Sequence, residues 1–488
     1  FGTPDVDQPF SDTCCPGCGA VLHCTAPEVP GYLPSEKFKV LLREGGLTGA
    51  TCQRCHLLTH HHRAMSLQVS AEQYRAVVQN IQPLKALVLL IVDLLDIPDS
   101  IVPDLPELVG TNKHIIVLGN KIDLLPMDSP NYLQRIRRHL TQCCHDAGFG
   151  TQLADIHLIS AKTGYGVEAL VSSLQRSWKY KGDVYLVGLA NAGKSTLFNT
   201  LLESDYCKSR ASDVVHKATI SPWPGTTLNL LKFPIMNPTP HRMFRRQRRL
   251  DAARRTEAEL PQDERKRLQH LSRKGYLVGE TAGTDVHWTP AFTPVSTCPK
   301  LHPLYSPLCQ RSYLSPPVSQ ILSLLTEKEV MSVVVTQAII PRTFVLKPST
   351  SLLVGGLARI DFLQVVRVLS YAPIKSTHDS SQDLVFTCAL IPACCLQVPM
   401  GGPERMRQFP AFVPQDLRLE GRGYLEAAAD ITLSSAGWVA VTAAAGEQLL
   451  LRLHGPQAAA FRVRTPPLLP HLISLKGERI RKSAAYKT

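Results

Sequence analysis

The stretch Gly188-Leu-Ala-Asn-Ala-Gly193-Lys194-Ser195 decides the fold of this chain. It follows an apolar run, Val184-Tyr-Leu-Val187, and opens a helix-like segment at Gly193. A strand, a loop that ends in Gly-Lys-Ser and a helix make up the P-loop pattern, whose backbone N–H groups surround phosphate oxygens at the positive end of the helix. The alternative is a turn that merely joins a strand to a helix, and eight matching positions in this context argue against it.

The P-loop pattern also predicts the roles of its residues. Backbone N–H groups from Asn191 to Lys194 are expected to bind phosphate oxygens, the Lys194 ammonium to reach the β- and γ-phosphates, and the Ser195 hydroxyl to bind Mg²⁺. The predicted phosphate-binding residues are Gly188, Asn191, Ala192, Gly193, Lys194, Ser195 and Thr196.

Two further motifs concern the base of the nucleotide. Asn120-Lys121-Ile122-Asp123 follows an apolar run, 114–118, and Ser160-Ala161-Lys162 follows another, 156–159. An aspartate carboxylate can accept the N1–H and N2–H₂ groups of guanine, a pair of donors that adenine lacks. Alone, the first motif is weak and a surface turn is its alternative, but three motifs at three strand ends support one another. The predicted guanine-binding residues are Asn120, Lys121, Asp123, Ser160, Ala161 and Lys162.

The order of these motifs is unusual. Apolar runs alternate with helical patterns over about residues 80–235, which predicts an α/β domain with a parallel sheet. In ordinary GTPases the phosphate loop comes first, whereas here both guanine motifs precede it, so the order predicts a circularly permuted P-loop GTPase domain. Downstream, Pro224-Gly225-Thr226-Thr227 fits switch I, with Thr227 as the ligand of Mg²⁺ and sensor of the γ-phosphate. Lys194 and Thr227 are the predicted catalytic residues.

Cysteines cluster near the beginning of the chain. Cys15-Pro-Gly-Cys18 and Cys52-Gln-Arg-Cys55 form two C-x-x-C pairs, which together supply the four thiolates of a tetrahedral Zn²⁺ site. Cys14 and Cys24 are alternative ligands. Four thiolates leave no open position for water, so the predicted zinc is structural. The histidines 60–62 are expected to lie in a surface loop.

Composition narrows the class of protein. The chain has 488 residues, of which 44% are hydrophobic and 19% charged, so it is neither disordered nor fibrous. Its net charge of +13 favours a polyanionic partner such as nucleic acid, or an anionic membrane surface. Residues 241–274 hold 12 Lys/Arg against five acids, either as a solvated surface insertion or as a phosphate contact. The longest apolar run, 86–92, is too short to span a bilayer, and because the chain begins at Phe1 no targeting peptide can be read.

Together, the two C-x-x-C pairs and the permuted motifs resemble the YqeH family of circularly permuted GTPases, in particular its animal mitochondrial branch. The resemblance runs from about Cys15 to the C-terminus and includes the segments 324–330 and 399–402. It implies GTP/GDP, Mg²⁺ and Zn²⁺ as cofactors, and GTP hydrolysis coupled to assembly of the small mitochondrial ribosomal subunit through ribosomal RNA. It also implies a mitochondrial matrix location, with peripheral contact to the matrix side of the inner membrane or to respiratory complexes. The sequence says nothing of the oligomeric state.

The predicted organisation has three domains. They are a treble-clef-like zinc module at 1–66, a permuted GTPase domain at 67–320 and a mixed, β-rich C-terminal domain at 321–488 that contacts RNA or protein. The GTPase domain is expected to contain a basic insertion at 238–275 and an irregular, proline-rich linker at 288–317.

The sequence departs from the family pattern at one motif. The resemblance implies a switch II motif of the type Asp-Thr-Pro-Gly, but none occurs between Thr227 and Leu324, where Glu280-Thr-Ala-Gly283 replaces the aspartate. Either the motif has been lost or the segment comes from an alternative or wrongly predicted exon, and we favour the second explanation. The alternative function is therefore a nucleotide-binding RNA or protein scaffold with little or no hydrolysis.

Overall fold

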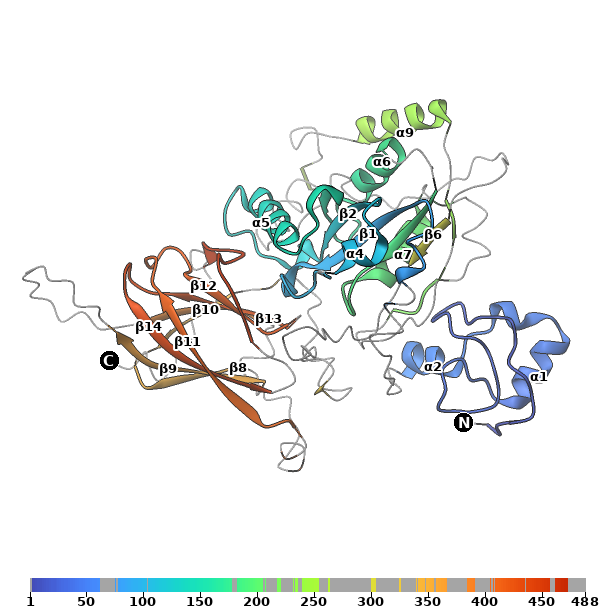
Figure 1. Cartoon of the computed structure of the whole chain (residues 1–488), viewed down its shortest axis with the longest axis horizontal. Helices are drawn as coiled ribbons and strands as arrows, with labels where there is room; N and C mark the ends of the chain where they lie inside the picture. Colours follow the sequence, from blue (N-terminus) through green and yellow to red (C-terminus); the bar gives the residue numbers. More distant parts are fainter. Residues whose placement is uncertain are drawn as a thin grey trace, which may run out of the picture. The chain divides into compact units, whose positions relative to one another are not determined.

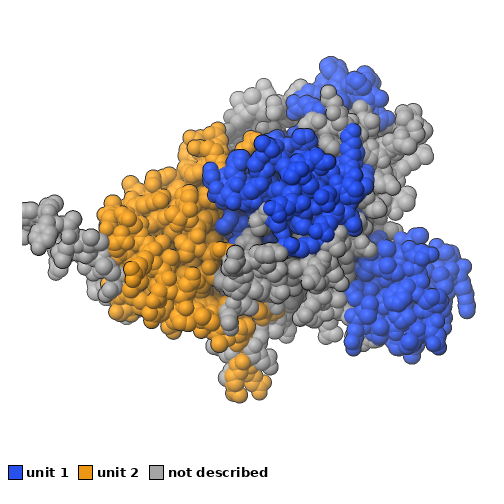
Figure 2. Space-filling model, viewed as in Figure 1, with its two compact units in different colours: residues 1–123, 141–310 blue, residues 124–140, 311–488 orange. Residues whose placement is uncertain are grey.

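The computed structural model divides the chain into two compact units. Unit 1 comprises residues 1–123 and 141–310, and unit 2 comprises residues 124–140 and 311–488 (Figure 2). The predicted boundaries at 66/67 and 320/321 stay a prediction. The structure describes residues 2–61, 75, 78–102, 104–177, 182–204, 207, 217–220, 231, 233–235, 239–253, 262–263, 300–303, 324–325, 339, 341–346, 348–354, 357–366, 384–390, 404, 407, 409–434, 436–456 and 461–472.

A six-stranded sheet forms the core of unit 1 (Figure 1). Its spatial order is β3-β2-β1-β4-β6-β5, and the first five strands in this order run parallel. The strands are β1 (Ala86–Asp93), β2 (His114–Asn120), β3 (Leu153–Leu158), β4 (Asp183–Val187), β5 (Phe233–Pro234) and β6 (Lys300–Pro303). Every residue of β1 is buried, as expected for a central strand of a parallel sheet with both faces covered. The predicted parallel α/β domain is confirmed.

Two helices of unit 1 pack against this sheet through regularly spaced apolar residues. Leu170 and Leu174 of one helix, and Leu197 and Leu201 of another, join strand residues such as Leu89 in one buried cluster. The helices and helical turns between residues 94 and 253 are α4 (Leu105–Val109), α5 (Tyr132–Asp146), α6 (Val167–Ser177), α7 (Lys194–Glu203), α9 (Pro240–Ala253), η3 (Leu94–Asp96), η4 (Ile122–Leu124) and η5 (Gly150–Gln152). Residues 124–140, which include the first part of α5, belong to unit 2. In the part of the chain that the structure describes, no helix combines the length and the apolar character needed to cross a bilayer.

The predicted irregular linker at 288–317 contains one short strand, and its other residues lie outside the described ones. Strand β6 lies within it and pairs parallel with β4, with Leu301 opposite Val184, and antiparallel with the short strand β5. Residues Lys300-Leu-His-Pro303 carry little intrinsic β-propensity. The strand forms because the backbone N–H and C=O groups along the edge of β4 would otherwise be buried without hydrogen-bond partners. Pairing with β4 therefore outweighs the low β-propensity of these four residues.

The N-terminal module surrounds its own small core. Its helical elements are α1 (Ser35–Arg43), η1 (Gly46–Gly49), α2 (Gln53–His56) and the π-helical turn η2 (Leu57–His61). Leu22, Leu33 and Phe38 are buried against five cysteine side chains. His60 and His61 are exposed as predicted, but they lie in a helical turn that continues α2 rather than in a loop.

Unit 2 is built mainly from two antiparallel sheets, which confirms the β-rich prediction. The sheet orders are β15-β12-β13-β10-β7 and β11-β14-β9-β8. The strands are β7 (Arg342–Leu346), β8 (Thr350–Val354), β9 (Ala358–Val366), β10 (Leu384–Leu390), β11 (Phe412–Glu420), β12 (Ala429–Thr432), β13 (Gly437–Thr442), β14 (Gln448–Pro456) and β15 (Arg462–Arg464). Along β14, buried and half-buried residues alternate, so one face of that sheet is covered and the other is more open.

Candidate nucleotide site and metal centre

The predicted nucleotide loops leave one edge of the sheet of unit 1. Asp93 at the end of β1 is in register with Asn120 at the end of β2, and Leu90 is in register with Val187 at the end of β4. The Ser160-Ala161-Lys162 loop follows β3 at the same edge. Carboxyl ends of neighbouring parallel strands are where α/β proteins bind ligands. The structure therefore brings together the motifs that the sequence spreads over residues 120–196.

One side chain joins all three loops. The Asn120 amide nitrogen donates a hydrogen bond to the carbonyl of Ala192 in the P-loop, with an N···O distance of 2.7 Å. The Asn120 carbonyl oxygen accepts from the backbone N–H of Ala161, at 2.9 Å. Asn120 is buried, so these bonds are shielded from water. The phosphate loop and the two guanine loops consequently form one hydrogen-bonded unit.

The P-loop needs its glycine at position 193. Gly193 has a φ of 102°, a left-handed conformation that residues with a Cβ rarely adopt. A Cβ there would also collide with the amide nitrogen of Asn120. Asn191, with a φ of 59°, is a residue type that tolerates this region. The shape of the loop therefore depends on left-handed backbone at both positions and on the missing side chain at Gly193.

Lys194 begins α7 with its side chain folded into the loop. Its ammonium donates to the carbonyl oxygens of Gly188, at 2.9 Å, and Leu189. The residue is only 2% exposed, and burial, together with the positive charge of Lys121, lowers the pKa of Lys194. A buried ammonium favours a nearby anion, because an anion offsets the cost of removing the charge from water. The donor set and the charge fit a nucleotide phosphate.

The remaining predicted contacts lie around this loop. Ser195 and Thr196 are half-buried in the first turn of α7, and Asp123 is buried at 8% exposure. Ser160 is fully buried, and its hydroxyl oxygen accepts from the N–H of Thr163 at 3.1 Å, so it shapes its own loop. Lys162 is exposed beside them. Thr227 and the rest of Pro224-Gly225-Thr226-Thr227 lie outside the described residues.

Sequence reasoning missed Asp93. Its carboxylate accepts from the Lys121 ammonium at 2.6 Å and from the backbone N–H of Leu95 at 3.0 Å, and its exposed fraction is 1%. Lys121 itself has a φ of 68°. The ion pair holds the lysine of Asn-Lys-Ile-Asp in one place above β1. An acid at the end of an apolar run was the signal that could have identified it.

Asn199 was also missed. From α7, its side-chain amide donates to the carbonyl of Ala218 at 3.0 Å and accepts from the N–H of Ala218 at 2.8 Å. The N–H of the next residue, Thr219, donates to the carbonyl of Gly17 between the first pair of cysteines, at 3.0 Å. Residues 217–220 are thus held between the P-loop helix and the N-terminal module.

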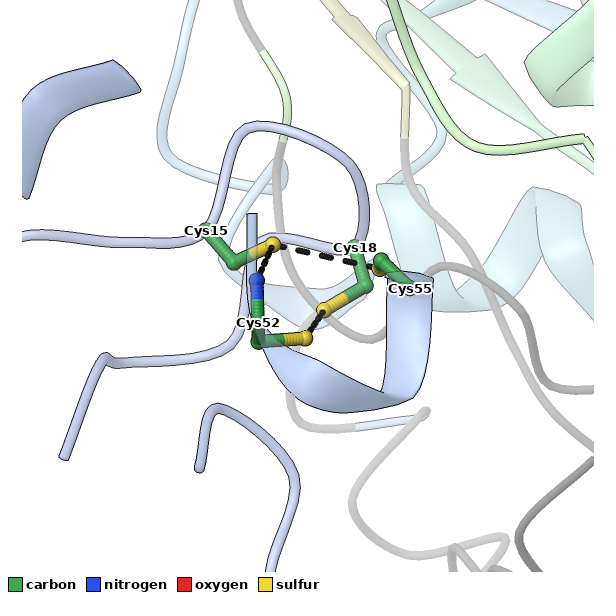
Figure 3. A group of neighbouring side chains, drawn as sticks. All are labelled: Cys15, Cys18, Cys52 and Cys55. Atoms are coloured by element: carbon green, nitrogen blue, oxygen red, sulfur yellow. Dashed lines mark hydrogen bonds between the residues drawn. The ribbon is translucent and has the colours of Figure 1, made fainter. Parts of the chain in front are cut away.

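The four predicted zinc ligands converge. Cys15 and Cys18 come from a loop, whereas Cys52 and Cys55 flank the start of α2 (Figure 3). All four are fully buried and their sulfur atoms lie within 4.8 Å of one another. Cys14 is exposed, and Cys24 lies in the same core without joining the group.

The spacing of the sulfur atoms fits zinc. The Sγ atoms of Cys15 and Cys55 are 3.8 Å apart, and those of Cys18 and Cys52 are 3.7 Å apart. A Zn–S bond of about 2.3 Å in a tetrahedron places neighbouring sulfur atoms about 3.8 Å apart. Hydrogen bonds among the four thiols lower the pKa of Cys15 and raise the pKa of Cys18 and of Cys55. The residues could therefore hold a structural zinc ion, which would bring four thiolates together.

Replacing Cys18 with serine is expected to reduce bound zinc from about one ion per chain to nearly none, because three thiolates bind the ion far less tightly than four. Elemental analysis of the purified chain measures this. Cys14→Ser is the matched control and should retain the metal, since Cys14 is exposed outside the cluster. Loss of zinc from the control but not from Cys18→Ser would contradict the assignment.

The fold and the joined loops define a GTPase of the P-loop class with a circularly permuted nucleotide domain; enzymes of this class use GTP, GDP and Mg²⁺. Comparison with known proteins agrees. Residues 183–244 match the family described as a 50S ribosome-binding GTPase. Nitric oxide-associated protein 1 of Mus musculus is 47% identical over an alignment of 555 positions, which covers 99% of this chain and 79% of that protein.

Two further relatives point to the same family. The human protein of the same name is 46% identical, with 100% of this chain and 79% of that protein covered. The uncharacterized protein YqeH of Bacillus subtilis strain 168 is 29% identical over 223 residues, which cover 45% of this chain and 55% of YqeH. The chain belongs to the nitric oxide-associated protein 1 family of YqeH-type GTPases.

Proposed function

We propose that this chain is a mitochondrial GTPase that binds the small ribosomal subunit through RNA and supports its assembly, and so mitochondrial translation and respiration. GTP would order Thr227 and the loops near it, and hydrolysis to GDP and phosphate would release them and change the affinity for RNA. Lys194, Mg²⁺ and the P-loop amides would neutralise the developing charge.

A single observation carries the nucleotide-binding part of this proposal. Asn120 hydrogen-bonds to Ala192 and to Ala161, so the loops for phosphate and for guanine are fixed with respect to each other. A rigid arrangement of this kind lowers the entropy lost when a nucleotide binds to both loops. It supports recognition of the guanine and the phosphates as one ligand.

A mitochondrial location is supported by the relatives. One of them, from Arabidopsis thaliana and 31% identical over 231 residues, is named NO-associated protein 1, chloroplastic/mitochondrial. We extend this location to the matrix, with peripheral contact to the inner membrane or to respiratory complexes through basic surface residues. Such a contact depends on attraction between basic side chains and anionic lipid or acidic protein.

The alternative is a scaffold that binds nucleotide but hardly hydrolyses it. Strand β6 lies beside the P-loop strand β4, and the chain continues after Pro303 as Leu304-Tyr-Ser-Pro307. No Asp-X-X-Gly motif follows this strand, although the position beside the P-loop is where an aspartate could reach Mg²⁺. This observation favours weak hydrolysis by the isolated chain.

Single-turnover hydrolysis of GTP by the full chain tests the two candidates. The reaction is measured alone, with small mitochondrial ribosomal subunits and with large ones. The proposal expects slow hydrolysis alone and faster hydrolysis with small subunits. GTP binding without hydrolysis in any of the three reactions would support the scaffold, and acceleration by large subunits only would overturn the choice of partner.

Helix α9 is the proposed RNA contact within the GTPase domain. Part of the basic insertion forms this helix, and Arg245 and Arg248 on it are exposed. Arg246 instead donates to the hydroxyl of Ser172 at 2.5 Å and pairs with the Glu168 carboxylate, both on α6. Arg246 therefore anchors the helix to α6. Arg245 and Arg248 are the residues proposed to bind phosphates.

Replacing Arg245 and Arg248 together with glutamine is expected to weaken RNA binding and to flatten its dependence on salt. The slope of log K against log salt should fall by about 1.4 to 1.8, because each phosphate contact contributes about 0.7 to 0.9. Fluorescence anisotropy with a ribosomal RNA fragment at several salt concentrations measures the slope. Replacing two exposed arginines of unit 2, Arg418 and Arg422, provides a control of equal charge. An equal slope change in both variants would mean that α9 has no special role.

A further inference from the structure

The loop that follows the guanine motif belongs to unit 2. Asp123, which is predicted to read guanine, lies in the short turn η4, and residues 124–140 group with the C-terminal part of the chain. Upstream, the N–H of Ile122 donates to the carbonyl of Ile159 at 3.3 Å. Downstream, the carbonyl of Leu124 accepts from the N–H of Ile339 at 2.9 Å. The turn that carries Asp123 is therefore held on both sides by residues distant in sequence.

Asp128 connects this loop to a distant part of unit 2. Its side chain is completely buried, and both carboxylate oxygens are used. One oxygen accepts from the guanidinium of Arg135 and from the hydroxyl of Ser129, and the other accepts from the backbone N–H of His471 at 3.1 Å. Bonds to a buried carboxylate are stronger than neutral ones. Asp128 thus ties the loop to a turn near the end of the described chain.

A second buried carboxylate holds the same turn. Asp430 on β12 accepts from the N–H of Leu468 at 2.8 Å, and from Nε and Nη2 of Arg464 at 2.9 and 2.7 Å. The Arg464 guanidinium lies 5.4 Å from the ring centroid of Trp438, a fully buried residue of β13. The turn 468–471 is therefore clamped between the core of the antiparallel sheet and Asp128.

The negative charge of Asp128 also acts on Asp430. Burial raises the pKa of Asp430, and among the further influences Arg464 lowers it while the negative charge of Asp128 raises it. A change in the position of Asp128 therefore alters the electrostatic energy of Asp430. The loop at Asp128 and strand β12 are thus linked through hydrogen bonds to the turn 468–471.

We propose that Asp128 is a positioning residue for the guanine site: by tying the loop after Asp123 to the turn 468–471, it lets the C-terminal unit set how fast GDP leaves. This inference rests on the proposed function for its partner, because ribosomal RNA bound to unit 2 would be the regulator. By linkage, a ligand that shifts the turn and weakens guanine binding is itself bound less tightly when GDP is present. Asp128 touches no nucleotide; it acts through the peptide chain that joins it to Asp123.

Asp128→Ala in the full chain is the direct test. Release of a fluorescent GDP analogue, measured by stopped flow without ribosomes, is expected to become about tenfold faster, within the usual range of coupling between sites. Asp128→Asn keeps an acceptor oxygen and should show a smaller effect. The matched control is Asp416→Ala, which removes an exposed ion pair with Arg452 in the same unit and should leave release unchanged.

A double-mutant cycle separates positioning from general destabilisation. If Asp128 acts through Asp123, its replacement should no longer accelerate GDP release in an Asp123→Asn background, whereas independent effects would multiply. If the effects of the two substitutions on the GDP release rate multiply, the proposal is overturned. It is also overturned if folded Asp128→Ala releases GDP at a rate within twofold of the wild-type rate. If Asp128→Ala does not fold, the same cycle is measured with Asp128→Asn, and a wild-type GDP release rate in that variant overturns the proposal. Because no ribosome or hydrolysis enters this assay, failure here is distinct from failure of the proposed function.

Discussion

Replacing Lys194 with alanine is expected to abolish GTP and GDP binding at micromolar concentrations. In the structure the Lys194 ammonium lies inside the P-loop and donates to two of its carbonyls, and a bound nucleotide would replace these partners with phosphate oxygens. Two charge-assisted hydrogen bonds of about 1.5–3 kcal/mol each amount to about 3–6 kcal/mol. Since about 1.4 kcal/mol is a factor of ten, affinity should fall by about 100- to 10,000-fold.

Isothermal titration calorimetry with GDP and with a non-hydrolysable GTP analogue measures this loss. Lys217→Ala is the matched control, because Lys217 is an exposed lysine that pairs with Glu203. The GTP analogue should lose more affinity than GDP, since only GTP has the γ-phosphate that Lys194 is predicted to reach. Wild-type affinity in folded Lys194→Ala would show that the P-loop is not the nucleotide site.

Replacing Asp123 with asparagine is expected to exchange guanine preference for xanthine preference. The carboxylate can accept from both N1–H and the N2 amino group of guanine, whereas an asparagine amide offers one acceptor and one donor. Xanthine has a carbonyl in place of the amino group and so matches the amide. Losing two bonds to a charged group predicts a fall of about 100- to 10,000-fold in GDP affinity.

Competition between GDP and xanthosine diphosphate measures the exchange in preference. The Asp146→Asn variant, altered at an exposed acid of α5, should behave as wild type. Binding of xanthosine diphosphate also reports on folding, because it requires an intact P-loop and an intact Asn120. Unchanged guanine preference in Asp123→Asn would overturn the assignment of the guanine motif.

The nucleotide loops were predictable because each follows a short apolar run. Parallel strands place their carboxyl ends on one edge, so three motifs after three strands had to meet there. What holds them together was not predictable in detail. Asn120 bonds to residues 72 and 41 positions away in sequence, and a spacing pattern does not specify such distances.

For the zinc ligands, too, the sequence predicted the kind of site, and the tertiary structure decided which residues form it. Two C-x-x-C pairs predicted four thiolates, but six cysteines lie in the first 55 residues, and Cys14 and Cys24 were equally available by sequence. Only packing separates them, because it buries four sulfur atoms at tetrahedral spacing and leaves Cys14 exposed. Strand β6 was missed for a related reason, since the demand for its pairing comes from β4.

The sequence alone determined the class of this protein: its order of motifs predicts a permuted GTPase, and its cysteine spacing predicts a metal module. These features are local, and short-range geometry is enough to specify them. The tertiary structure decided which distant residues support the site. Asp93 beneath Lys121, Asn199 beside Ala218 and Asp128 against His471 are contacts across long stretches of chain. Their existence depends on how strands and loops pack, because a buried polar group is stable only where folding brings it a partner.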